Sequence, residues 1–166
     1  MKKILLFFAI ILLFGCQNTF DLSEEDTQII CPNVFFSSEN SVFVDGEIEN
    51  LELEKVNFKA SLNNYKFINQ CNSDVKNNNY LLEILILVEP INPNTQIINL
   101  PIFVIFYDNQ DNVIDKKYFR IKENLKFNEE TSEYQLTDVI GRLNISLDKS
   151  KEASSLIIGF VKIKKN

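Results

Sequence analysis

The stretch Val56–Asn63 reads VNFKASLN, and every second residue in it is apolar. The apolar side chains, from Val56 to Leu62, alternate with Asn, Lys and Ser. Side chains of a β-strand point to opposite faces in turn, so this period of two predicts a strand with one buried and one solvated face. The pair Asn63-Asn64 at its end predicts a bend in the strand.

Two other stretches are apolar at nearly every position. Residues 81–88 read LLEILILV and residues 102–106 read IFVIF. A buried helix is the competing interpretation, but the short length, the β-branched and aromatic content and the nearby prolines favour strands. Such strands need cover on both faces, so we expect them at the centre of a sandwich, with the outer face partly exposed or covered by a loop. The sharper hypothesis is that one outer face binds a partner, because large exposed apolar patches are unusual on monomers.

Shorter apolar runs, separated by loops rich in Asn, Pro, Gly and Asp, fill the rest of the chain. These runs are Val34–Phe36, Val42–Val44, Val113-Ile114 with Tyr118–Ile121, and Leu156–Ile163, and apolar residues also alternate with polar ones in Tyr134–Leu147. Asp108–Asn112 is expected to form a hairpin turn, and Gly141 a bulge. About seven strands in all predict an all-β fold, a two-sheet antiparallel sandwich of the immunoglobulin-like kind.

The first residues of the chain predict export. Lys2 and Lys3 precede an unbroken apolar block from Ile4 to Phe14, which ends at Gly15-Cys16. A basic start, about a dozen apolar residues and a small residue at the end are typical of a secretory signal peptide, whereas a membrane span needs roughly 20 apolar residues. A soluble secreted protein cleaved near Gly15 is one interpretation.

The residues Leu13-Phe14-Gly15-Cys16 resemble the lipobox of bacterial lipoproteins. The resemblance implies that residues 1–15 are a lipoprotein signal peptide and that Cys16 is lipidated and becomes the first residue of the mature chain. In such lipoproteins an aspartate after the cysteine favours the inner membrane. Gln17 stands there, which predicts an outer-membrane protein that faces the periplasm.

Residues 16–30 are expected to hold the lipidated cysteine and an acidic tether, and residues 31–166 the β-sandwich domain. The segment from Gln17 to Ile30 contains Glu24-Glu25-Asp26 and no periodic apolar face. As a flexible coil it would span roughly 20 Å. It would hold the domain just off the bilayer.

The charge of the chain excludes some classes of partner. The net charge is −6, and without residues 1–15 the balance is 15 basic against 23 acidic residues. Such a body repels nucleic acid and anionic lipid surfaces. We therefore expect no nucleic-acid partner, and membrane contact through the acyl chains.

Cys31 and Cys71 are the two cysteines left once Cys16 is lipidated. In an oxidising compartment they predict one intramolecular disulfide. The alternatives are free buried thiols, or a compartment poor in oxidants where the pair stays reduced.

Several short motifs together resemble an uncharacterised family of small Gram-negative bacterial lipoproteins. The motifs are Cys31-Pro32-Asn33-Val34, the later lone Cys71, Pro101-Ile102-Phe103-Val104, Lys117-Tyr118-Phe119 and the terminal Ile158-Gly159-Phe160. The resemblance implies an anchored domain and a Cys31–Cys71 pair. The resemblance implies no known activity for the protein.

The sequence predicts neither an enzyme nor a cofactor or metal site. Without histidine, the usual base for a Ser or Cys nucleophile is missing, and a dyad of Ser150 with Lys149 or Lys151 falls in a charged turn. Asp108–Asn112 resembles a calcium loop but lacks its glycine and its glutamate. The stripe formed by the glutamates at positions 47, 49, 52 and 54 is expected to protect an edge strand.

The function expected is therefore that of a lipid-anchored cell-envelope protein that acts as a binding or structural module, with a possible protein partner in the envelope. The alternative is a carrier that holds a small hydrophobic ligand. A carrier predicts an apolar cavity of a few hundred Å³, and an interaction module predicts a flat apolar patch.

Overall fold

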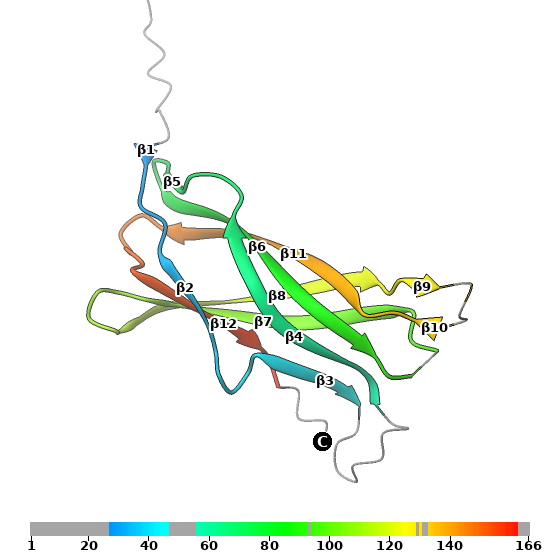
Figure 1. Ribbon diagram of the computed structural model, residues 1–166. Coiled ribbons are helices and arrows are strands. Elements are labelled where there is room, and N and C mark those ends of the chain that lie inside the picture. The colour runs from blue at the N-terminus through cyan, green and yellow to red at the C-terminus, as the bar shows by residue number, and fades with distance from the viewer. Residues whose placement is uncertain (1–26, 47–55, 93, 129, 131–132, 163–166) are drawn as a thin grey trace, which may run out of the picture.

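The computed structural model describes residues 27–46, 56–92, 94–128, 130 and 133–162. Within these ranges the chain forms twelve strands and no helix. Ten of them build two sheets that pack against each other, with β4, β6 and β11 in front of β7 and β8 in Figure 1, and the remaining two form a separate two-stranded sheet. The predicted all-β sandwich is confirmed, whereas its immunoglobulin-like connectivity stays a prediction.

The first sheet, sheet A, is built around β6, which is the longest strand. In order across the sheet, its strands are β1 (Thr27–Gln28), β5 (Asn72–Ser73), β6 (Asn77–Pro90), β4 (Val56–Phe67) and β3 (Val42–Gly46), and β11 (Thr137–Asp148) pairs with β6 from the other side. Every pairing in sheet A is antiparallel. The strand β6 therefore has neighbours on both edges, as its nearly continuous apolar sequence predicts.

The second sheet, sheet B, has four strands. Their order is β2 (Asn33–Phe36), β12 (Ser155–Phe160), β7 (Ile97–Tyr107) and β8 (Val113–Asn124). The pair β2–β12 is parallel, in contrast to the antiparallel sandwich that was expected. Parallel strands need a long crossover connection, and here nearly the whole domain lies between the two strands.

Twelve strands are more than the seven expected, and the excess comes mainly from very short ones. The strands β1, β5, β9 (Phe127–Asn128) and β10 (Glu133–Tyr134) have two residues each. Two residues cannot show a period of two, so sequence patterns miss such strands.

The core lies between the two sheets. On β6, the side chains of Leu82, Ile84, Ile86 and Val88 are fully buried. The inward residues of the neighbouring strand β11 and of β7 in the opposite sheet are buried with them. Each fully buried aliphatic side chain stabilises the fold by roughly 1.5–3 kcal/mol relative to leaving it exposed. The intervening residues of β6, such as Leu85, are half-buried on the outer face. The strand β6 is therefore fully covered on its inner face and partly covered on its outer face.

The predicted bend at Asn63-Asn64 is present as a β-bulge. The register between β4 and β6 shifts between Leu62 and Asn64. Beyond the bulge, Tyr65 pairs with Ile84 and therefore faces the core side of the sheet. Its ring forms edge-on contacts with Phe36 of sheet B and with Phe67. The bulge thus places an aromatic cluster where β2 and β4 approach each other.

The predicted bulge at Gly141 is wrong, because β11 pairs with β6 without interruption from Thr137 to Asp148. Gly141 faces inward, and a Cβ at this position would collide with Cδ1 of Ile121 on β8. The absence of a side chain therefore leaves room for the end of the Ile121 side chain between the two sheets and does not mark a kink.

Candidate functional site

The predicted disulfide is present and joins the two sheets. Cys31 precedes β2 of sheet B and Cys71 precedes β5 of sheet A, with 5.3 Å between their Cα atoms. Cys71 is buried. Cys16, the predicted lipidation site, and the glutamate stripe at positions 47–54 lie outside the described residues.

The paired part of the chain begins before the domain boundary predicted at Cys31. Thr27 and Gln28 pair with Ser73 and Asn72, and the backbone N–H of Ile29 donates to the carbonyl of Cys71 over 2.9 Å. Residues assigned to the tether thus form the end of sheet A, where β1 lies beside β5 in Figure 1. The disulfide follows directly, so this entry point of the chain is fixed by hydrogen bonds and a covalent bond.

The outer face of sheet B carries a group of aromatic and aliphatic side chains that come from two adjacent rows of paired residues. One row runs across the four strands through Phe35, Ile157, Ile105 and Lys116, and the next contains Gly159, Phe103 and Tyr118. We call this surface the aromatic face. It consists of Phe35, Phe103, Ile105, Lys116, Tyr118 and Ile157.

Two side chains of the aromatic face are largely exposed. The exposed fraction is 57% for Phe35 and 63% for Tyr118, which lie on the two edge strands, whereas Phe103, Ile105 and Ile157 are half-buried between them. Isolated exposed apolar residues are common, but a contiguous group of aromatic and aliphatic side chains marks an interaction surface. This observation favours the hypothesis that one outer face of the apolar strands binds a partner.

Gly159 and Lys116 hold Phe103 in place on this face. A Cβ at Gly159 would collide with Cζ of Phe103, so the ring occupies the space that a side chain would fill. The ammonium group of Lys116 lies 5.3 Å from the ring centroids of both Phe103 and Tyr118, within the range of a cation–π contact. The aromatic face is therefore a packed surface with a positive charge beside the Phe103 and Tyr118 rings, toward the β8 edge of the sheet.

The charges on the outward face of β8 are all basic, whereas its inward face carries Lys117 as well as acidic residues. Lys116, Arg120 and Lys122 pair with outward residues of β7, whereas Asp115 and Glu123 pair with the buried Phe106 and Ile98. Among the described strand residues that face outward on sheet B, no carboxylate occurs. This distribution is unusual for a chain with a net charge of −6.

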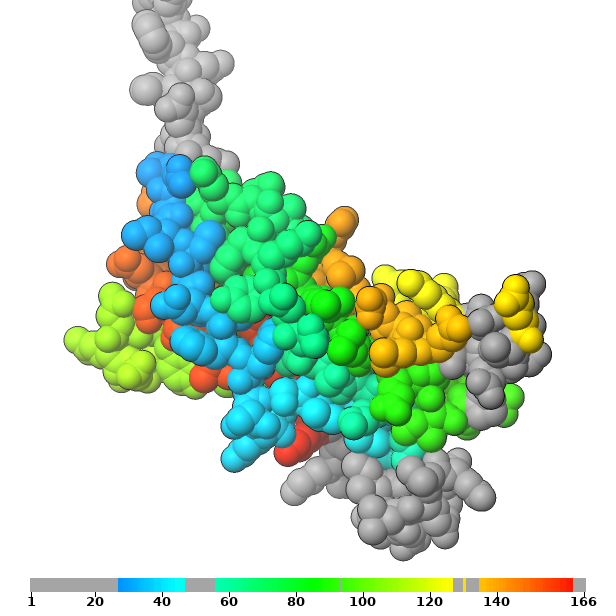
Figure 2. All heavy atoms as spheres, viewed as in Figure 1, coloured from blue at the N-terminus to red at the C-terminus, as the bar shows by residue number. Residues whose placement is uncertain are grey.

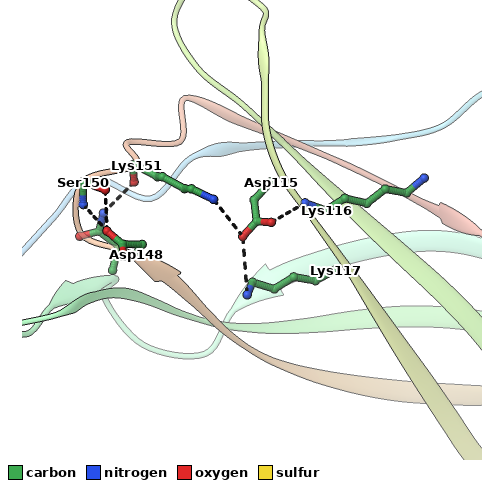
Figure 3. A network of polar contacts seen from close by, with 7 residues as sticks. Asp115, Lys116, Lys117, Asp148, Ser150 and Lys151 are labelled. Atoms are coloured by element: carbon green, nitrogen blue, oxygen red, sulfur yellow. Dashed lines mark hydrogen bonds and ion pairs between the residues drawn. The ribbon is translucent and has the colours of Figure 1, made fainter.

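Asp115 is held on the other side of β8 by a polar network that Figure 3 shows. Its carboxylate accepts the backbone N–H of Lys116 over 2.8 Å and lies 3.7 Å and 3.9 Å from the ammonium groups of Lys117 and Lys151. The side chain of Lys116 runs away from this network. The carboxylate of Asp115 is therefore bound near the turn after β11. The side chain of Lys116 does not take part in this network and lies on the aromatic face.

The outer face of sheet A differs, because its charges are mixed and paired. Glu83 is nearly buried between Lys66 and Arg142, at 2.8 Å and 2.9 Å. The hydrogen bonds from Lys66 and then Arg142 lower the pKa of Glu83 below its ordinary value. The surface formed by β4, β6 and β11 is seen in Figure 2. Around Glu83, one negative and two positive groups are engaged with each other, so the cations there are paired and not all available to a partner.

Other acidic groups stabilise turns. Asp108 accepts the backbone N–H groups of Asn112 and Gln110, which lowers its pKa and fixes the hairpin turn that the sequence predicts. Asp148 likewise accepts the hydroxyl and the backbone N–H of Ser150, which lowers the pKa of Asp148. The hydroxyl of Ser150 therefore belongs to a turn and not to a dyad with a lysine. Asp74 has a pKa lowered by hydrogen bonds from Asn79, Lys76 and Asn77.

No cluster of three or more potential metal ligands occurs among the residues that the structure describes. An open depression of about 320 Å³ lies beside the disulfide and is lined by Gln28, Asn69, Gln70, Cys71 and Asn72. Four of its five lining residues have polar side chains, and it is open to solvent, unlike the apolar cavity that a carrier of a hydrophobic ligand needs. The depression therefore does not favour the carrier alternative.

Comparisons of the chain with protein-family models, with curated protein sequences and with solved structures gave no match. In the described part of the chain, no helix has the length and apolar character to cross a membrane. The resemblance to small bacterial lipoproteins accordingly stays a prediction.

Sequence reasoning found the strands of the aromatic face but not the face itself. The apolar run at Ile102–Phe106 pointed to β7, whereas Phe35 and Ile157 come from opposite ends of the chain and meet only through the β2–β12 pair. The alternation of Lys116, Tyr118 and Arg120 along β8 was a usable signal for an outward face that is both aromatic and basic.

Proposed function

We propose that this protein is a lipid-anchored component of the bacterial cell envelope, anchored at the outer membrane, facing the periplasm and without catalytic activity. The proposed anchor is Cys16, and the proposed task of the domain is to bind another envelope component through the aromatic face. The single observation that carries the binding role is this contiguous, partly exposed group of aromatic and aliphatic side chains. The anchoring is supported by the lipobox-like residues Leu13–Cys16.

The arrangement of the domain supports this role. The chain enters the sandwich at β1, beside the disulfide, and β2 with Phe35 follows within the next few residues. A domain held by such a short segment stays close to the membrane, and its local concentration there is high. Weak contacts made by the aromatic face are then sufficient for binding.

The anchoring is tested by metabolic labelling with a fatty acid in bacteria that express the full chain, with Cys16→Ala as the control. We expect label on the unchanged protein, no label on the variant, and recovery of the labelled protein with outer-membrane fractions. An unlabelled protein that fractionates with cytosolic material would contradict the proposal.

The binding role is tested separately with a photoreactive amino acid in place of Tyr118 or, as the matched control, Ile140. Ile140 is 48% exposed and lies on the outer face of sheet A. We expect cross-links to an envelope component from position 118 and few from position 140. Equal labelling from both positions would show that the aromatic face has no specific role.

A further inference from the structure

The aromatic face has a net positive charge although the chain as a whole is acidic, and its shape is that of an open sheet. We infer that this face binds the surface of a bilayer that contains anionic phospholipid. The inference deepens the proposed function, because it names the envelope component that the aromatic face contacts. It also means that the repulsion expected from the net charge does not act at this face.

The local charge is the first argument. Lys116, Arg120 and Lys122 share the outward face of β8, and no outward-facing residue of the described strands of sheet B is acidic, since Asp115 and Glu123 of β8 lie on its other face. Basic side chains near an anionic membrane surface are attracted to it within about one Debye length. The aromatic face thus has the charge that complements an anionic bilayer.

Some acidic groups lie close to the basic residues, namely Asp115 and Glu123 on the other face of β8 and Glu39 in the loop after β2, whereas others lie farther away. The carboxylates on the outer face of sheet A, such as Glu89 and Asp138, are on the opposite side of the sandwich. Packed sheets are roughly 10 Å apart, and the Debye length at 0.1 M salt is about 10 Å. Repulsion from the groups on sheet A is therefore weakened by screening when sheet B faces the membrane, and the outward lysine and arginine side chains are the nearest charges on the face itself.

The acidic hairpin turn does not interrupt the basic part of the face. Asp108 and Asp111 lie in the β7–β8 turn, which projects from the body of the molecule in Figure 2. Along β8, the outward basic residues extend from Lys116 to Lys122, away from this turn. The turn therefore marks one end of the surface.

The side chains and their arrangement are the second argument. Tyrosine concentrates at the boundary between water and lipid, because its ring is apolar and its hydroxyl is polar, and exposed phenylalanine rings enter the acyl boundary. Phe35 and Tyr118 are exposed on opposite edges of a four-stranded sheet. A peptide partner is usually bound in a groove or along a free strand edge. A broad sheet face with aromatic residues at both edges instead matches a planar partner.

The test uses the chain from residue 16 onward with Cys16→Ser, so that no acyl chain is present. This chain retains all of the described strands and the disulfide. The protein has no tryptophan, so Tyr118→Trp introduces a single fluorescent reporter on the aromatic face, and Ile140→Trp a matched reporter on sheet A. Each is titrated with vesicles of phosphatidylglycerol and brominated phosphatidylcholine, whose bromine atoms quench nearby tryptophan.

We expect quenching of the tryptophan at position 118 and little quenching at position 140. Vesicles without phosphatidylglycerol should bind at least about tenfold more weakly. In the Tyr118→Trp background, Arg120→Gln with Lys122→Gln should weaken binding about tenfold. Lys59→Gln with Lys126→Gln changes the net charge equally at other exposed positions, and should weaken binding by no more than about twofold.

Three results would overturn the inference: equal quenching of the two reporters, binding that does not depend on phosphatidylglycerol, or equal effects of the two pairs of glutamine substitutions. Failure to bind these vesicles, together with cross-linking of position 118 to an acidic protein in cells, would identify a protein partner instead. Because the tested chain has no lipid anchor, these results are independent of the fatty-acid labelling of Cys16.

Discussion

Arg142 donates its Nε–H to Oε1 of Glu83 over 2.9 Å, between the adjacent strands β11 and β6. Lys66 of β4 binds the other carboxylate oxygen of Glu83 over 2.8 Å, so three strands of sheet A meet at one nearly buried acid. A buried carboxylate is tolerated only when its charge is paired and its oxygens accept hydrogen bonds. Glu83 meets both conditions, although it interrupts an otherwise apolar strand.

Glu83→Gln should lower the stability of the fold at neutral pH. It should also reduce the amount of stability that is lost when the pH becomes acidic. The folded state lowers the pKa of Glu83, whose ordinary value is 4.5. The stabilisation is thus present above that value and is lost as the pH falls through the lower, folded-state pKa. Urea unfolding between neutral pH and pH 3 should show a smaller loss of stability for the variant than for the unchanged protein. The variant should still lose some stability at acidic pH, because other carboxylates also have lowered pKa values in the folded state. These are Asp74, Asp108 and Asp148. Identical pH profiles would contradict this role of Glu83.

Gly141→Ala should destabilise the fold by about 1–2 kcal/mol, because the new methyl group collides with Ile121. Without that contact, alanine in a strand would be more stable than glycine by roughly 0.5–1 kcal/mol. Ile121→Val removes the methyl group that lies closest, so it should cost less in the Gly141→Ala background than in the unchanged protein. Urea unfolding of the four proteins measures this coupling. Additive effects would show that Gly141 and Ile121 are not in contact.

Removal of the Cys31–Cys71 disulfide should lower the free energy of unfolding by up to about 4 kcal/mol, because the bridge closes a long loop in the unfolded chain. The measurement is thermal unfolding of the unchanged protein with and without a reductant. Cys31→Ala with Cys71→Ala is the control, and its midpoint should match that of the reduced protein and not respond to the reductant. A reductant that leaves the unchanged protein unaffected would contradict the prediction.

Ile84→Ala and Leu85→Ala compare the two faces of one strand. Ile84 is fully buried between the sheets, and its truncation should cost roughly 2–5 kcal/mol. Leu85 is half-buried on the outer face and pairs with Ile140 on β11. Its loss should cost less than that of Ile84 but more than that of Ile140→Ala. Equal costs at positions 84 and 85 in urea unfolding would show that the outer face of β6 is covered as completely as the inner one.

The strands that are long enough to show a pattern could be predicted from the sequence. Residues 56–62 alternate as expected, and the bend at Asn63-Asn64 is a real bulge. The apolar runs in β6 and β7 are central strands, as their composition predicts. These features depend on neighbours in the sequence, which is why a sequence pattern can reveal them.

Features that depend on contacts between distant segments could not be predicted in the same way. Gly141 and Ile121 meet between the two sheets, so the sequence around Gly141 alone suggested a bulge. The aromatic face joins Phe35 to Tyr118 through two intervening strands, and a shift of one residue in any pairing would turn its side chains inward. The aromatic face could therefore be recognised only once the pairing register of the strands was known, and the register is seen only in the assembled sheet.

The disulfide also determines how the domain responds when its amino-terminal end is pulled. Tension applied ahead of Thr27 first strains the two-residue β1–β5 pair, which has few hydrogen bonds to resist it. It then reaches Cys31, and the covalent bond to Cys71 transfers the load into sheet A before the edge strand β2 can be peeled from β12. The aromatic face, which begins on β2, is thereby shielded from mechanical stress at the point where the chain joins the sandwich.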